Sequence, residues 1–191
     1  IGNRLAGHLW CRLGDEVLVD AFREALIIFP KRETRSEFEH RLDQYRASLF
    51  TCKGDCNKPA ITRDGQAISI EANLAAHGGG DTAIENGADG VGLLRIEELY
   101  FAREMPPSEE ELFSELYRLV APLREKPVTI RLLDVGGDKA IPSLQLPFEL
   151  NPLLGKRGVR LLLAYPQLAR IQIKTLLRLS RNQDIRILVP M

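Results

Sequence analysis

Apolar residues follow two different periods in the first part of the chain. Residues 16–20 and 25–29 are short apolar runs of β type, separated by a polar turn, and Pro30 stops the second run. Helical spacing then begins, with an apolar stripe at intervals of four, three and four residues, formed by Phe38, Leu42, Tyr45 and Leu49. These patterns predict two strands and then a helix over residues 36–50 with one apolar face. The polar, turn-rich stretch at 51–59 predicts a linker.

Strand-type and helix-type segments alternate from about residue 59 onward. The predicted strands lie at residues 67–73, 90–95, 128–135 and 185–190. The predicted helices lie at residues 81–85, from Ser108 through Val120, and over residues 166–180. Ser108 and Glu111 have the spacing of a capping box, which marks the start of a helix. Alternation of this kind predicts an α/β fold with a parallel sheet.

Four strand–helix units are compatible with two architectures. The sheet is either a complete small sheet or half of an eight-stranded barrel, and in both cases ligands bind at the carboxyl ends of the strands. The stretch from residue 140 to residue 158 is long for a connection in a compact domain, and such excursions usually serve function. A functional site is therefore expected at the carboxyl ends of the second and third strands.

Composition and charge exclude several classes of protein. The 191 residues carry 26 basic and 26 acidic side chains, so charge does not indicate a nucleic-acid partner. No apolar run reaches the length of a membrane span, and no secretory leader is recognisable, so we expect a cytoplasmic protein without a membrane partner. Cys11, Cys52 and Cys56 do not make a disulfide framework. We interpret Cys52 and Cys56 as reduced thiols rather than as half of a metal site.

Arginine stands at the end of one apolar strand segment and inside another. Arg95 closes the second strand, and Arg131 lies in the third strand before a turn with two glycines that leads to Lys139. A further arginine, Arg157, lies in the long excursion. Guanidinium groups hold phosphate and carboxylate through two hydrogen bonds, and glycine lets backbone N–H groups approach a ligand. The set predicts a site for a small phosphorylated or carboxylated molecule; the alternative is that each arginine pairs with a nearby Asp or Glu as part of the framework.

A second basic pattern lies on the last predicted helix. Arg170, Lys174 and Arg178 recur every four residues there. A basic stripe of this kind is usually a solvated helix face, so we do not predict a binding site from it.

Three segments carry a resemblance to a known family. Residues 87–97 read GADGVGLLRIE, residues 131–139 read RLLDVGGDK, and residues 151–160 read NPLLGKRGVR. In order and spacing they resemble the PEP-binding domain of enzyme I, the phosphoenolpyruvate–protein phosphotransferase of the bacterial sugar phosphotransferase system. Pyruvate phosphate dikinase and phosphoenolpyruvate synthase share this barrel, but the form DVGGDK favours enzyme I. The resemblance runs from about residue 15 to residue 191.

This resemblance decides between the two architectures. It implies that residues 59–191 are the first half of a TIM barrel, that residues 1–35 are the tail of a phosphohistidine domain, and that residues 36–58 are a linker helix and loop. We expect a piece of a longer protein, since the chain begins with Ile1 and ends on a strand-type run. The phosphohistidine motif itself is expected upstream.

The resemblance also implies a reaction, in which phosphoenolpyruvate gives its phosphoryl group to a protein histidine and pyruvate is released. Arg95, Arg131 and Lys139 would bind the phosphate, and Arg157 would act in catalysis by stabilising the enolate oxygen or by orienting the substrate. Where the family usually has threonine after the first of these arginines, this chain has Ile96, so we expect a hydroxyl to be missing near the site.

Further partners are implied in the same way. The family uses Mg²⁺, whose Glu and Asp ligands lie on later strands together with a catalytic Cys, so no metal ligand is assigned here and these 191 residues alone are expected to be inactive. A phosphocarrier protein would bind through the N-terminal region, and the parent would be a homodimer. The alternatives are a piece of a dikinase-like or synthase-like enzyme, or a non-catalytic truncated barrel used for assembly.

Overall fold

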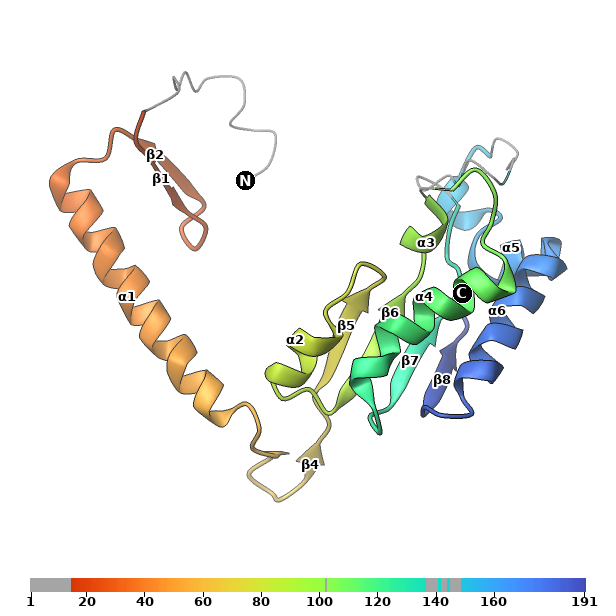
Figure 1. The fold of residues 1–191 in the computed structure, drawn as a ribbon. Helices are drawn as coiled ribbons and strands as arrows, with labels where there is room; N and C mark the ends of the chain where they lie inside the picture. The colour runs from red at the N-terminus through yellow and green to blue at the C-terminus, as the bar shows by residue number, and fades with distance from the viewer. Residues whose placement is uncertain (1–14, 102, 137–140, 142–143, 145–148) are drawn as a thin grey trace. The chain divides into compact units, whose positions relative to one another are not determined.

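The computed structural model describes residues 15–101, 103–136, 141, 144 and 149–191. The chain divides into two compact units, which meet in sequence between Asp55 and Cys56. Figure 1 labels the helices and strands of both units. Lys139 and Cys11 lie outside the described residues.

The first unit is a hairpin followed by one long helix. Strands β1 (Val17–Asp20) and β2 (Ala25–Ile28) pair antiparallel, which confirms the two predicted strands. Helix α1 spans Arg32–Asp55 and is longer at both ends than predicted. The predicted helix end at residue 50 was wrong, because no proline follows the apolar stripe before Pro59 and the helix continues to Asp55.

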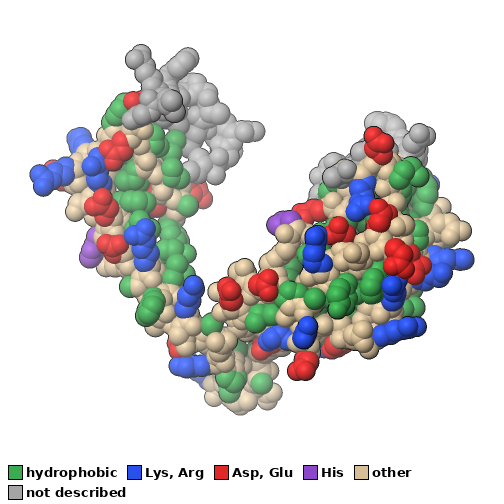
Figure 2. All heavy atoms as spheres, viewed as in Figure 1, with side chains coloured by type: hydrophobic (Ala, Val, Ile, Leu, Met, Phe, Trp, Pro, Cys, Tyr) green, Lys and Arg blue, Asp and Glu red, His purple; other side chains and the backbone are tan. Residues whose placement is uncertain are grey.

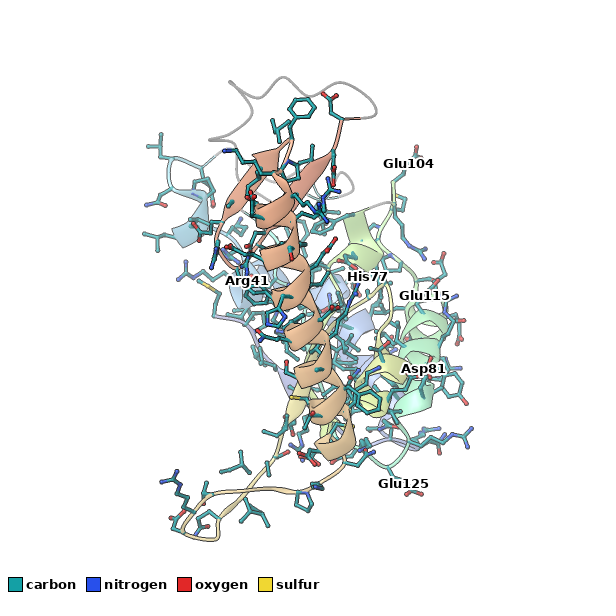
Figure 3. All side chains as sticks on the ribbon, turned by 90° about the vertical axis from the view of Figure 1, so that its left-hand side faces the viewer. Arg41, His77, Asp81, Glu104, Glu115 and Glu125 are labelled. Atoms are coloured by element: carbon teal, nitrogen blue, oxygen red, sulfur yellow. The ribbon has the colours of Figure 1, made fainter. Side chains whose placement is uncertain are left out.

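The apolar stripe of α1 contacts the hairpin only in part. The rings of Phe22 and Tyr45 meet edge to face, with centroids 5.1 Å apart. Arg41 of α1 donates to a carboxylate oxygen of Asp20 at 2.7 Å, and Figure 3 labels this arginine on the helix. No residue of α1 is buried, and hydrophobic side chains such as Phe50 are exposed, as the space-filling view in Figure 2 shows along this unit. Residues 15–55 therefore bury few side chains among themselves.

The second unit is built on a parallel sheet of four strands in the order β5–β6–β7–β8, which confirms the predicted α/β class. The strands are β5 (Glu71–Ala75), β6 (Gly90–Arg95), β7 (Val128–Arg131) and β8 (Ile185–Leu188). The single strand predicted at residues 67–73 was wrong. Its first part, β4 (Ala67–Ile68), pairs antiparallel with β3 (Ala60–Ile61) in a small hairpin.

The turn of this small hairpin explains the difference. Gly65 has a φ of 87°, and the backbone N–H of Gln66 donates to the Thr62 hydroxyl at 2.9 Å. A threonine hydroxyl and a glycine with positive φ together form a tight turn. The chain therefore folds back before the parallel strand starts at Glu71.

Helices cover one face of the parallel sheet, where α2, α4 and α6 pack in Figure 1. The helical segments of this unit are α2 (Gly80–Glu85), α3 (Glu98–Phe101), α4 (Glu109–Val120), η1 (Ala121–Leu123), η2 (Pro152–Leu154), α5 (Gly158–Ala164) and α6 (Pro166–Leu179). The predicted capping box is confirmed at the start of α4. Helix α5 was not predicted, because no element was assigned between the end of the long excursion at residue 158 and the helix that begins at Pro166.

The two faces of the sheet differ in polarity. Val128 and Ile130 of β7 are buried in the core together with residues of α4 and α6, whereas Thr129 and Arg131 alternate with them and point to the other face. This alternation places polar side chains on the face opposite to the helices. No helix among the described residues is both long and apolar enough to cross a membrane.

The basic stripe on α6 is largely exposed, as interpreted from the sequence, and two of its residues lie near carboxylates of α4. Arg178 pairs with Glu110 of α4 at 2.5 Å, and Lys174 lies 3.9 Å from Glu109. The guanidinium carbon of Arg178 also lies 3.8 Å from the ring centroid of Phe113. Two of the three stripe residues thus join α6 to the acidic first turn and aromatic face of α4.

Candidate functional site

The sheet places Arg95 and Arg131 side by side. In the parallel pairing of β6 with β7, Leu94 lies opposite Ile130, and both of these residues are buried in the core. Arg95 and Arg131 follow them directly, so they end neighbouring strands on the face away from the helices. This is the carboxyl end of the sheet, where ligands of parallel α/β folds bind.

A network of two arginines and two carboxylates lies at this end. Arg131 donates to Glu97 at 2.5 Å and lies 3.5 Å from an oxygen of Asp134. Arg157 binds the same Asp134 through two hydrogen bonds, from Nε at 3.1 Å and from Nη2 at 3.0 Å. The backbone N–H of Asp134 adds a long contact of 3.4 Å to Glu97. Asp134 therefore brings together Arg131 and Arg157, which are far apart in the sequence.

Burial makes these ion pairs strong constraints on the fold. The side chains of Glu97 and Asp134 are 6% and 11% exposed, and those of Arg131 and Arg157 are each 22% exposed. Removing one partner of a buried pair leaves a charge without compensation, which costs about 3–5 kcal/mol. The alternative interpretation, in which each arginine pairs with a nearby carboxylate, therefore describes the ion pairs that Arg131 and Arg157 form in this structure. Pairing does not remove all their hydrogen-bond donors, because a guanidinium has five.

Arg95 differs from the other two arginines. Its side chain is exposed, and among the described residues it has no ion-pair partner. Two arginines and two carboxylates balance in the network, so Arg95 adds a net positive charge at the neighbouring strand end. An uncompensated cation beside a balanced network attracts an anion to this edge of the sheet.

Glycine lets the loop that carries Arg157 approach the strand end. Gly136 has a φ of 124°, and a Cβ built there would lie 2.8 Å from the Cβ of Arg157. Gly158 follows Arg157 with a φ of 52°, and a Cβ built there would lie 2.7 Å from Cγ of Met191 and 3.2 Å from the carbonyl oxygen of Pro190. Larger residues would push these segments apart. Gly136 thus permits the close approach of the segment that carries Arg157, and Gly158 permits the approach of the chain end at Pro190 and Met191.

Sequence reasoning missed a buried polar group behind the site. Gln172 of α6 is fully buried, and its Oε1 accepts a hydrogen bond of 2.9 Å from the backbone N–H of Leu133. This bond holds the chain where it leaves β7, one residue before Asp134. A signal was present, since Gln172 and Thr175 interrupt an otherwise apolar helix face. Burial also raises the pKa of Tyr100, near Gln172, well above its usual range.

The expectation that a hydroxyl is missing near the site stays a prediction. The side chain of Ile96 is fully buried in the hydrophobic core. Residue 96 points to the helix-covered side, because it follows Arg95 and strand positions alternate. An isoleucine there contributes to packing rather than to the lining of the site.

The described residues do not form a metal site by themselves. Among them, no group of three or more His, Cys, Asp and Glu side chains is arranged to hold a metal ion. Glu97 and Asp134 are the acidic groups of the network, and both are engaged by arginine. A magnesium ion prefers carboxylate oxygens that are not already neutralised, so these two do not fit the role.

Comparison with known proteins gives a consistent match. Residues 52–191 match the PEP-utilising enzymes in the part described as their PEP-binding domain. A phosphoenolpyruvate-protein phosphotransferase of Bacillus subtilis (strain 168) is 37% identical over 178 residues, which is 93% of this chain and 31% of that protein. The protein of the same name from Staphylococcus carnosus (strain TM300) is 37% identical over 182 residues, with the same shares. A multiphosphoryl transfer protein of Rhodobacter capsulatus is 36% identical over 178 residues, 93% of this chain and 22% of that protein. The chain spans about a third or less of the length of these relatives.

Proposed function

The chain belongs to the PEP-utilising enzymes through their PEP-binding domain, and we propose that it is part of a phosphoenolpyruvate-protein phosphotransferase. Such a protein moves the phosphoryl group of phosphoenolpyruvate to a protein histidine and releases pyruvate. The observation that carries the proposal is the arginine cluster at the carboxyl ends of β6 and β7, where Arg95 stands beside the network of Arg131 and Arg157.

The arginines take different parts in this reaction. Arg95 and Arg131 hold the phosphate, and Lys139 adds a further charge to it. When the P–O bond breaks, its electron pair moves to the enol oxygen, so negative charge grows there. Arg157 offsets that charge or orients the substrate. Asp134 keeps the guanidinium of Arg157 in place before substrate arrives, so little rearrangement is needed during the reaction.

The proposed architecture is the first half of a TIM barrel over residues 59–191. It is supported by four neighbouring parallel strands in chain order, with helices on one face and polar side chains on the other. Residues 1–35 would be the tail of a phosphohistidine domain, and residues 36–58 a linker, mainly formed by α1. On this proposal the polar face of the sheet lines the inside of the barrel.

The remaining parts of the proposal come from the family. Mg²⁺ would be held by residues outside this chain and would neutralise charge on the substrate. A phosphocarrier protein would accept the phosphoryl group, and the parent would be a cytoplasmic homodimer in the sugar phosphotransferase system.

The test is a conservative substitution in the full-length protein. Arg131→Lys keeps a positive charge beside Glu97 but loses the forked guanidinium, so we expect PEP-dependent phosphorylation to fall by roughly 10²–10³-fold in kcat/KM. Arg41→Lys is the matched control, since Arg41 also pairs with a buried carboxylate but lies in the first unit. The melting temperatures of both variants are measured alongside the rates.

The two outcomes separate catalysis from structure. A large loss of rate with Arg131→Lys, at a melting temperature close to that of the parent, supports the proposal. Unchanged rates with a much lower melting temperature would assign Arg131 to the framework alone.

A further inference from the structure

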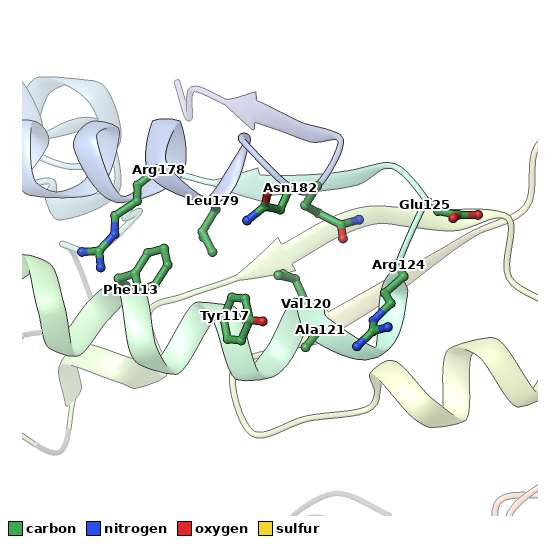
Figure 4. Close-up of a pocket in the computed structure, with 10 residues that line it drawn as sticks. Phe113, Tyr117, Val120, Ala121, Arg124, Glu125, Arg178, Leu179 and Asn182 are labelled. Atoms are coloured by element: carbon green, nitrogen blue, oxygen red, sulfur yellow. The ribbon is translucent and has the colours of Figure 1, made fainter.

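A cavity lies at the amino ends of the parallel strands, opposite to the edge that carries the arginine network. Helices α4 and α6 end there, next to the turns that lead into β7 and β8, and they border a cavity of about 350 Å³. Figure 4 shows its lining, with Phe113 and Tyr117 on α4, Leu179 on α6, and Arg124 and Asn182 on the two turns. Because parallel strands have all their carboxyl ends at one edge, this cavity is remote from the arginine network.

The aromatic wall of the cavity is held in place. The rings of Phe113 and Tyr117 stack with centroids 5.9 Å apart and planes 22° apart. Arg178 covers the Phe113 ring, and Glu110 anchors its guanidinium. Tyr117 remains half exposed, at 52%. A flat, preorganised aromatic surface is thus open to the cavity.

The second feature of the cavity lining is Arg124, which lies in a turn whose backbone is fixed by hydrogen bonds. The turn from Leu123 to Lys126 is closed by a hydrogen bond of 3.0 Å between their backbone groups. Glu125 within it has a φ of 65°, a conformation that glycine normally supplies in such a turn. Gln183 ties the turn to the start of β8, because its Nε2 donates to the carbonyl oxygens of Leu123 and Lys126. Strained backbone of this kind, which costs about 1 kcal/mol or more, persists where the surroundings enforce it.

The charges favour an anion. Among the described residues Arg124 has no ion-pair partner, and its side chain is exposed. Of the two arginines in the lining, Arg178 is paired with Glu110, so Arg124 is the guanidinium left to bind an anion, and it forms no ion pair with Glu125, the acidic residue of the lining. The carboxyl ends of α4 and α6 carry partial negative charge, which disfavours a bound anion by about 0.3–1 kcal/mol. A charged hydrogen bond from arginine contributes about 1.5–3 kcal/mol and outweighs this.

We propose that this cavity binds a small anion that carries a flat ring, such as an aromatic carboxylate or phosphate ester. The ring lies against Tyr117 and Leu179, and the anionic group binds Arg124 and the side-chain amide of Asn182. A volume of about 350 Å³ is at the lower end of the range for small-molecule sites. The ligand class follows from one aromatic wall and one unpaired guanidinium on the same cavity.

The site is independent of the proposed phosphotransfer site. It uses side chains of helices and turns at the amino ends of the strands, none of which belongs to the arginine network. In α/β barrels this face does not carry the reacting groups. We therefore infer a binding site without chemistry of its own.

The experiment titrates the isotopically labelled 191-residue chain with phenyl phosphate and follows amide chemical shifts. Saturable shifts at Tyr117, Leu179 and Asn182 are expected, with a Kd on the order of 1 mM. Inorganic phosphate lacks the ring and benzyl alcohol lacks the charge, so each is expected to bind roughly tenfold more weakly. Excess phosphoenolpyruvate should not reverse the shifts, which distinguishes the cavity from the strand ends.

Two variants complete the test. Arg124→Gln, at an exposed position, should weaken binding of phenyl phosphate roughly tenfold. Arg118→Gln is the matched control, because Arg118 lies on α4, is 75% exposed and pairs with Glu115 rather than lining the cavity. The proposal fails if no saturable shifts occur at the cavity, if benzyl alcohol binds as tightly as phenyl phosphate, or if both variants bind like the parent chain.

Discussion

Asp20 in the hairpin unit and Glu97 in the sheet unit are the two buried carboxylates among the described residues, and their surroundings differ. Asp20 accepts hydrogen bonds from the backbone of Arg23 at 3.2 Å and from Arg41 at 2.7 Å. One cation meets one carboxylate, and the pair joins the end of β1 to α1. Around Glu97, by contrast, Arg131 shares a second carboxylate with Arg157, and another arginine ends the next strand.

The comparison shows which features separate the candidate site from a structural ion pair. The Nε atoms of Arg41 and Arg131 are both buried without a hydrogen-bond partner. An unpaired guanidinium nitrogen therefore does not distinguish the structural pair from the candidate site. The difference lies in the position at the carboxyl ends of parallel strands and in the uncompensated charge of Arg95.

The largest effect on stability is expected from Glu97. Glu97→Ala leaves Arg131 mostly buried without its main carboxylate, so the free energy of unfolding of the sheet unit should fall by about 3 kcal/mol. Urea denaturation followed by circular dichroism measures this. Glu115→Ala is the control, because its pair with Arg118 is exposed and should be worth at most about 0.5 kcal/mol. Equal losses for both variants would show that burial does not govern these pairs.

A smaller effect on stability is expected at Gly136, where the chain passes close to Arg157. Gly136→Ala should lower the free energy of unfolding by about 2 kcal/mol, because it combines a positive φ with a Cβ placed 2.8 Å from the Cβ of Arg157. Gly65→Ala shares the positive φ but meets nothing within 4 Å, so it should cost only about 1 kcal/mol. Thermal unfolding compares the two, and no difference between them would argue against a close approach of the two segments.

The hairpin unit offers a third test of the comparison. Asp20→Asn keeps an acceptor for Arg23 but removes the charge that binds Arg41, so amides of β1 and β2 should exchange faster with solvent. Hydrogen bonding from Arg41 holds the pKa of Asp20 below its ordinary value. The stabilisation is therefore present above the unfolded-state pKa and is lost as pH falls through the lowered folded-state pKa. If the substitution leaves amide exchange unchanged, the pair between Asp20 and Arg41 does not stabilise the hairpin.

The smallest effect concerns an exposed carboxylate in the capping box of α4. Hydrogen bonds from the Ser108 side chain and backbone, and from Arg103, lower the pKa of Glu111 from 4.5 to about 2. Because the folded-state pKa is lower, stability should decline as pH falls from about 5 towards about 2. Glu111→Gln should flatten part of this decline, which melting temperatures across that pH range will show. If the melting temperature of the variant declines as steeply as that of the parent, Glu111 does not contribute to the pH dependence of stability.

Much of the framework follows from local patterns. The alternation of strand and helix periods predicted the parallel α/β class, and the capping box at Ser108 marked the start of α4. The strand predicted at residues 67–73 was wrong, because an apolar run does not reveal where a tight turn redirects the chain. The start of α1 at Arg32 likewise preceded its apolar stripe, since a helix can begin with polar residues.

The sequence by itself determined the kind of chemistry, because arginine at the end of an apolar strand, beside glycine, is a local pattern. Only the tertiary structure decided which charges meet: Glu97 and Arg131 are 34 residues apart, and Asp134 and Arg157 are 23 apart. The same holds for Gln172 behind the site and for the cavity between α4 and α6. Such contacts depend on how distant segments pack, and periodicity along one segment carries no information about its neighbours in space.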